Sequence, residues 1–204
     1  MLFENHQSPW LDEELRILQK AVRKFYHKEF VPLNEKWIDQ GIVDRDAWSK
    51  AGKAGLSCAE IPTEYGGAGG DYRHETVIIE EMLRAGISGF GNQVHNSIVA
   101  PYLFNYGNEE QKQRWLPKMA SGEMVGAIAM TEPDTGSDLQ NIRTTAIRDG
   151  DDYLITVRKP TSATVSMQTS SSLWQNPIRQ KARKASPWSR WKPKAIQALN
   201  EVGI

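Results

Sequence analysis

The sequence predicts an α+β protein, in which an all-α helical N-terminal region is followed by antiparallel β-structure from about Val125. Apolar residues recur at helical spacing through residues 1–123, and short β-branched runs replace that pattern afterwards. Residues 156–204 show neither period. We therefore expect helices first, strands next and an irregular tail at the end.

The first helices follow from apolar spacing and from proline and glycine signals. One apolar face recurs every three or four residues and predicts a helix: Leu15, Leu18, Val22 and Phe25. Ser8-Pro9 is a start signal for this helix, and Pro32 is expected to end or interrupt it. A second helix is expected over 44–54, closed by Gly55, before a glycine-rich loop at 61–70.

Three more helices and three strands are expected in order. The helices are predicted over 75–85, over 94–105, and over 109–119 after an Asn108 cap. Short β-type runs are expected as strands: 125–131, 144–149 and 153–155, with a hairpin turn at Asp149-Gly150-Asp151. We expect His95 to be a structural histidine, and Glu80 and Glu81 to form a solvated or helix-packing edge.

Composition limits the class of protein. The 204 residues hold 25 basic and 25 acidic side chains, and no apolar run approaches the roughly 20 residues of a membrane span. The single cysteine, Cys58, can form neither an internal disulfide nor a cysteine-based metal site, and no metal site is predicted. The N-terminus lacks the pattern of a secretory signal, so a reducing, cytoplasmic location is expected.

One junction segment connects the sequence to a known family. GAIAMTEPDTGSD (126–138), with IPTEYGGAGGD (61–71), APYLFNYGNEEQKQRWLPKMASGE (100–123) and SDLQNIRTTAIRDGDDYLI (137–155), resembles the FAD-dependent acyl-CoA dehydrogenases, most closely their long-chain-like branch. The resemblance implies an N-terminal helical domain at 1–123 and the start of an antiparallel, β-barrel-like middle domain at 124–155.

The resemblance also implies a cofactor and a substrate site. Five residues are expected in the FAD site: Ile128, Met130, Thr131, Gly136 and Ser137. Gly136 makes the turn, and Ser137 also touches the acyl-CoA. A strand that enters a Gly-Ser turn offers backbone N–H groups and the Thr131 hydroxyl to the flavin edge. Alone, such hydroxyls more often cap turns. The family usually has TEPGAGSD, and Asp134 and Thr135 depart from it.

The tetrapeptide at 134–137 has a second interpretation. Asp-Thr-Gly-Ser is also the active-site sequence of aspartic proteases, whose chemistry requires two carboxylates that share a proton. The chain holds no second copy, and the preceding helices do not belong to that fold. We therefore reject the protease hypothesis.

The tail differs in charge from the rest of the chain. Residues 1–155 carry a net charge of −8 and residues 156–204 a net charge of +8, with three of the seven tryptophans. A basic segment with tryptophans could bind nucleic acid or another anionic surface. A shift of the reading frame within the gene explains the composition of the tail better than a binding function does. We therefore do not expect nucleic acid as a partner.

A shift of one base recovers family segments from the tail. With codons built from the third base of one residue and the first two of the next, 156–165 permits NGSKTYISNG and 165–175 permits QHADLVIVVA. In the same frame, 180–189 permits KGAKGISLV and 197–204 permits GFERGRN. Four family segments in register predict a single-base deletion near the boundary of Ile155 and Thr156, either a real frameshift or a sequencing error. The expected consequences are a truncated chain and a poorly structured tail.

The resemblance implies α,β-dehydrogenation of acyl-CoA thioesters, as in fatty acid β-oxidation, with an electron-transfer flavoprotein as acceptor and a homo-oligomer as the intact form. The catalytic glutamate of the family lies in a C-terminal helical domain, so no catalytic residue is nominated among these 204. A polypeptide of this length is expected to be an inactive fragment, because it lacks the base for proton abstraction.

Overall fold

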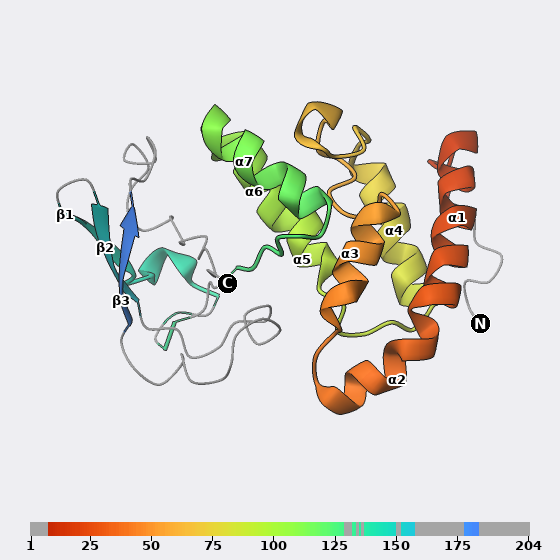
Figure 1. Ribbon diagram of the computed structural model, residues 1–204, viewed down its shortest axis with the longest axis horizontal. Helices are drawn as coiled ribbons and strands as arrows, with labels where there is room; N and C mark the ends of the chain where they lie inside the picture. Colours follow the sequence, from red (N-terminus) through yellow and green to blue (C-terminus); the bar gives the residue numbers. More distant parts are fainter. Residues whose placement is uncertain are drawn as a thin grey trace.

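The computed structural model of the protein describes residues 8–128, 132–133, 135, 137–149, 152–157 and 178–183. Figure 1 shows a group of helices and a small sheet, joined by one extended link after the last long helix. The helices are α1 (Glu13–Glu29), α2 (Val31–Gln40), α3 (Arg45–Lys53), α4 (Tyr72–Arg84), α5 (Asn92–Val94), α6 (Ala100–Tyr106) and α7 (Glu109–Ala120). Single turns of 3-10 helix lie at Thr63–Tyr65 and Leu139–Asn141.

The first two helices differ from the sequence prediction. Helix α1 begins at Glu13, because the Asp12 carboxylate accepts the Leu15 N–H at 3.0 Å, so the Ser8-Pro9 start signal is wrong. Pro32 lies in the first turn of α2. N–H groups in a first turn have no partner within the helix, so the helix loses no hydrogen bond through the proline. Pro32 therefore begins a helix that the sequence did not predict.

Side-chain caps define the later helices. Helix α4 starts before the predicted residue 75, because the Asp71 carboxylate accepts the Arg73 N–H and His74 Nδ1 accepts the Asp71 N–H. The predicted Asn108 cap of α7 is confirmed: its side chain accepts the Gln111 N–H at 2.8 Å. These polar caps bond N–H groups that the helices themselves leave unpaired.

An aromatic core holds α1, α2 and α3 together. Phe30 makes edge-to-face contacts with Trp37 and Phe90, with ring centroids 5.2 and 5.0 Å apart, and Trp48 lies 4.6 Å from Phe90. A second apolar cluster packs α6 and α7 against the chain around residues 58–65. The helical part therefore has its own core, as the spacing predicts.

Helices α5 and α6 form one continuous helix interrupted by a π-helical turn, His95–Val99. His95 and Asn96, adjacent in this turn, are both fully buried. Turns of π-helix are rare and often lie at functional sites, because they change which side chains face inward.

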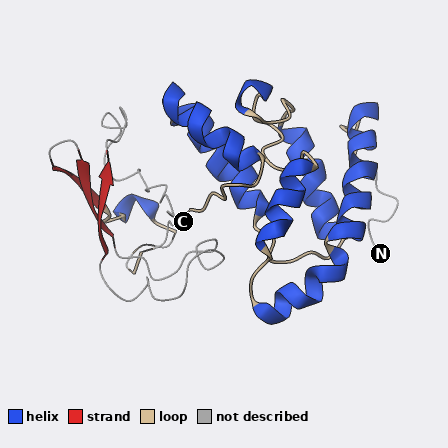
Figure 2. Ribbon diagram, in the orientation of Figure 1, coloured by secondary structure: helices blue, strands red, loops and turns tan. Residues whose placement is uncertain are grey.

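The sheet holds three antiparallel strands in the order β1 (Thr145–Asp149), β2 (Asp152–Val157) and β3 (Ile178–Arg183). Asp149 pairs with Asp152, which confirms the hairpin predicted there. Figure 2 shows the strands apart from the helices.

One strand prediction is wrong, and one strand is not predicted. Residues 125–128 form no strand, and 129–131 lie outside the described residues. Strand β3 lies in the tail that was expected to be irregular and pairs with β2 from Asp152↔Arg183 to Val157↔Ile178. Backbone hydrogen bonds to the free edge of β2 need no particular side chains, so tail residues can form this strand. Among the described helices, none is both long and apolar enough to cross a membrane.

Candidate functional site

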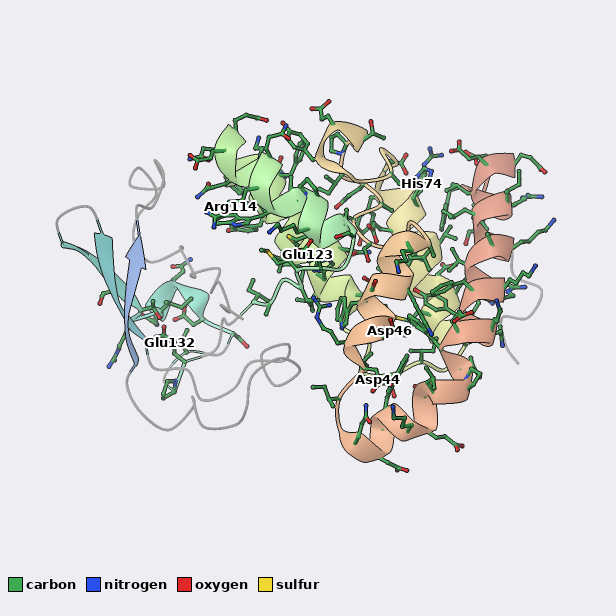
Figure 3. All side chains as sticks on the ribbon, viewed as in Figure 1. Asp44, Asp46, His74, Arg114, Glu123 and Glu132 are labelled. Atoms are coloured by element: carbon green, nitrogen blue, oxygen red, sulfur yellow. The ribbon has the colours of Figure 1, made fainter. Side chains whose placement is uncertain are left out.

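The link between the two parts is fixed to the helical domain by a series of hydrogen bonds that involve the backbone of the link. Arg45, at the start of α3, donates from its guanidinium to the carbonyls of Gly122, at 2.6 Å, and Glu123. The Met124 N–H donates to the Lys118 carbonyl at 2.9 Å. Figure 3 shows Glu123 on this link beside the helices. The chain therefore leaves α7 along a defined path.

His95 makes the next contact. Its Nδ1 accepts the Gly126 N–H at 2.9 Å, and its Nε2 lies 3.1 Å from the Met119 carbonyl oxygen at the end of α7. The imidazole also packs edge-on against Trp48, with centroids 5.4 Å apart. Burial lowers the pKa of His95 to about 4, so the ring is neutral at pH 7, with its proton on Nε2. A buried neutral imidazole is a structural histidine, as the sequence predicts.

Gly126 lies in a tight slot. A Cβ at this position would be 2.6 Å from Val99 Cγ1 and 3.1 Å from Met119 Cε. Two residues later, Ile128 is half-buried against the second apolar cluster. This tight fit fixes the position at which the chain leaves the helical domain.

Glu132 anchors the turn that follows. Its carboxylate accepts the Arg143 N–H at 2.6 Å, the Thr144 N–H at 3.0 Å and the Thr144 hydroxyl. The backbones of Glu132 and Thr135 also exchange two hydrogen bonds of 3.0 Å. Figure 3 shows Glu132 beside the sheet. This buried carboxylate ties the turn to the chain that enters β1.

The predicted site residues are only partly placed. Ile128 is half-buried and Ser137 is exposed, so they do not share one environment. Met130, Thr131 and Gly136 lie outside the described residues. The Thr135 hydroxyl is buried and has no hydrogen-bond partner in the described part of the chain.

Glu132 is the residue that sequence reasoning missed. In the sequence it stands out only as one letter of the junction motif at 126–138. Glu132 lies eleven residues before Arg143. Neither helical nor strand periodicity indicates a contact between residues so far apart in the sequence. Only the folded structure brings the Glu132 carboxylate to the N–H groups of Arg143 and Thr144 at the start of β1.

A second buried carboxylate lies inside the helical domain. Glu75 accepts the Ala59 N–H at 2.7 Å and a hydrogen bond from Asn96 Nδ2 at 2.9 Å. Asn96 also accepts the Cys58 N–H at 3.0 Å and donates to the Leu56 carbonyl at 2.9 Å. Burial raises the pKa of Glu75 to about 7. This network fixes the π-helical turn against the loop at 56–59.

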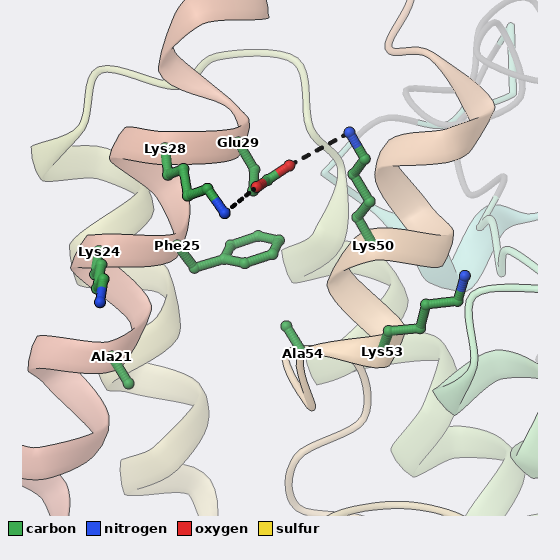
Figure 4. Close-up of a pocket in the computed structure, with 8 residues that line it drawn as sticks. All are labelled: Ala21, Lys24, Phe25, Lys28, Glu29, Lys50, Lys53 and Ala54. Atoms are coloured by element: carbon green, nitrogen blue, oxygen red, sulfur yellow. Dashed lines mark ion pairs between the residues drawn. The ribbon is translucent and has the colours of Figure 1, made fainter.

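An open groove of about 520 Å³ lies between α1 and α3 (Figure 4). Phe25 lies in it, and Glu29 forms ion pairs of 3.3 Å with Lys28 and Lys50. Hydrogen bonds from these two lysines lower the pKa of the Glu29 carboxyl. These ion pairs make the Glu29 carboxylate a weaker base than an unpaired one, so it is poorly suited to removing a proton from a substrate.

Comparison with known proteins identifies the family. The family described as "Acyl-CoA dehydrogenase, N-terminal domain" matches residues 12–123. The chain belongs to the acyl-CoA dehydrogenase family. The resemblance seen in the sequence is thereby confirmed.

Individual acyl-CoA dehydrogenases show the extent of the similarity. The mitochondrial long-chain specific acyl-CoA dehydrogenase of Rattus norvegicus is 45% identical over 139 residues, which are 68% of this chain and 32% of that protein. The chain therefore spans about a third of the length of this curated relative.

Solved structures of acyl-CoA dehydrogenases agree with the fold. The crystal structure of the Geobacillus kaustophilus enzyme has a TM-score of 0.73 and 45% identity, over 76% of this chain and 41% of that one. A glutaryl-CoA dehydrogenase of Mycobacterium smegmatis in complex with FADH2 also has a TM-score of 0.73, with 31% identity over 81% and 42%. The helical domain is thus that of the family.

Proposed function

We propose that the protein is an FAD-dependent acyl-CoA dehydrogenase of the long-chain type, which introduces a double bond between the α and β carbons of an acyl-CoA thioester. The observation that carries this proposal is the family match over residues 12–123, continued by the TEPDTGSD turn that Glu132 anchors.

The described residues fit a flavin beside this turn. The buried Thr135 hydroxyl lacks a partner in the described part of the chain, and Ser137, two residues later, is exposed. Such groups are available to a ligand that lies along the turn. We assign Ile128, Met130, Thr131, Gly136 and Ser137 to this FAD site, with Ser137 also contacting the acyl-CoA.

FAD, when bound, accepts the hydride that leaves the β carbon. The chain's own contribution is positional. Glu132 holds the turn, the Thr131 hydroxyl donates to the flavin edge, and backbone N–H groups of the turn add further donors. The base that removes the α proton is supplied, in this proposal, from outside these 204 residues. An electron-transfer flavoprotein takes the electrons, and the intact protein is a homo-oligomer.

A polypeptide of only these 204 residues is expected to show no bound-flavin spectrum and no turnover of acyl-CoA with a dye acceptor. The reason is that, in this proposal, these residues form one wall of the FAD site and the base lies outside them. A missing general base alone costs about 100-fold or more in rate. Absorbance at flavin wavelengths and dye reduction measure both properties.

The matched control is the reading frame restored by one base at the Ile155 codon and extended to the length of the relatives. This longer polypeptide is expected to be yellow and active. Turnover by the 204-residue polypeptide, or a longer polypeptide without flavin, contradicts the proposal.

The Thr131 assignment has its own test in the longer polypeptide. Thr131→Ala is expected to slow flavin reduction by about 5-fold or somewhat more, because it removes one hydrogen-bond donor worth about 1 kcal/mol from the flavin edge. Stopped-flow absorbance measures the rate. Reduction at the unchanged rate removes Thr131 from the site.

A further inference from the structure

We propose that His95 is a positioning residue for the cofactor: as a neutral acceptor for the Gly126 N–H, it fixes where the segment at 126–138 leaves the helical domain. This inference rests on the proposed function, because that segment carries the assigned FAD residues. His95 touches neither substrate nor cofactor in this proposal.

The hydrogen bonds of His95 require one protonation state. Nδ1 faces a backbone N–H, which can only donate, and Nε2 faces the Met119 carbonyl oxygen, which can only accept. The imidazole must therefore carry one proton, on Nε2. No side chain without a lone pair at the Nδ1 position can replace it.

The surroundings leave the imidazole little freedom. Its ring is fully buried, its edge contacts Trp48, and Cys58 Sγ lies 3.7 Å from Nε2. The next residue, Asn96, is held by Glu75 and by the loop at 56–59, so the backbone that carries His95 is fixed from the opposite side. Within the π-helical turn, His95 therefore contacts Gly126, and its neighbour Asn96 contacts Glu75 and Cys58.

Gly126 has equally little freedom. The slot between Val99 and Met119 admits no Cβ, so the peptide at this position lies in close contact with the helices. The hydrogen bond to His95 then selects the direction of its N–H within the slot. Since Ile128 and the turn at Glu132 follow within six residues, this direction sets the start of the path toward the FAD site.

Two substitutions separate the acceptor role from simple packing. Asn places its side-chain oxygen near the position of Nδ1 and can accept the Gly126 N–H. Gln places its amide nitrogen near the position of Nε2 and can donate to Met119, but leaves Gly126 unpaired. Both remove the ring from Trp48, so they lose the same aromatic contact.

The first measurements use the 204-residue chain. Long-range proton–nitrogen correlation at pH 7 is expected to show His95 with its proton on Nε2, and the opposite tautomer overturns the proposal without any variant. Amide hydrogen exchange of Gly126 is expected to be about 10-fold faster in His95→Gln and within about 3-fold of wild type in His95→Asn. Equal exchange in the two variants overturns the proposal.

The last measurement is FAD affinity in the longer polypeptide, titrated by flavin fluorescence. His95→Gln is expected to weaken binding about 10-fold, and His95→Asn by less than about 3-fold. If the unsubstituted polypeptide binds no FAD, the proposed function fails and the role of His95 fails with it. If it binds FAD and both variants weaken binding equally, only the His95 proposal fails.

Discussion

Replacing Asn96 by alanine is expected to lower the free energy of unfolding by about 4 kcal/mol, a large part of the stability of a domain of this size. The substitution removes the acceptor for the Cys58 N–H and the donor to Glu75, and both groups remain buried. Each buried polar group without a partner costs about 1–3 kcal/mol. Urea unfolding followed by tryptophan fluorescence measures the change.

Two other asparagines on the same continuous helix serve as controls. Asn105→Ala removes only an exposed hydrogen bond to the Pro101 carbonyl and is expected to change stability by less than about 0.5 kcal/mol. Asn92→Ala removes one donor to the Leu56 carbonyl, which Asn96 also serves, so about 1 kcal/mol is expected. Equal effects of the three substitutions contradict the network described around Glu75.

The second large effect is a pH dependence that arises from Glu75. Burial raises its pKa from 4.5 to about 7 in the folded chain, with Glu60 adding to the rise, while the unfolded chain keeps the ordinary value. The stabilisation by Glu75 is therefore complete below about pH 4.5 and is lost as the pH rises through about 7. The total is about 3 kcal/mol, since each pKa unit corresponds to about 1.4 kcal/mol.

His95 opposes this trend. Its folded pKa, lowered to about 4, gives a stabilisation that is present above about pH 6.5 and lost as the pH falls through about 4. Between about pH 4.5 and 6.5 the two slopes cancel. The wild-type chain alone therefore cannot isolate Glu75.

Comparison with Glu75→Gln isolates it. The free energy of unfolding of wild type minus that of Glu75→Gln is expected to fall by about 2.5 kcal/mol between pH 5 and pH 8. Glu80→Gln removes a carboxylate from the same helix at a half-buried position, and its difference from wild type serves as the control. A pH-independent difference for Glu75→Gln shows that this carboxyl titrates normally.

The helical domain could largely be predicted because its signals are local. The Asn108 cap and the apolar face around Val22 each depend on residues within one or two turns. Helix α2 was missed because Pro32 is equally compatible with the end of one helix and the first turn of the next. Only the packing of Phe30 and Trp37 in the aromatic core decides between them.

The candidate site was predicted less completely because its contacts are distant in sequence. The motif at 126–138 indicated the flavin segment, but neither period nor composition reveals that Glu132 contacts Thr144. His95 was recognised as structural, yet its bond to Gly126 spans 31 residues. Strand β3 shows the same limit, because its partner β2 offers a backbone edge that side-chain patterns do not encode.

The order of the strands has a consequence for how this chain meets other proteins. With β2 in the centre, one edge of β1 and one edge of β3 carry backbone N–H and C=O groups without a strand partner among the described residues. Such edges attract any extended peptide. In a nascent or isolated chain, these edges are sites at which strands of neighbouring molecules can pair edge to edge through backbone hydrogen bonds. Further strands that covered these edges would therefore protect the protein from self-association as well as complete its fold.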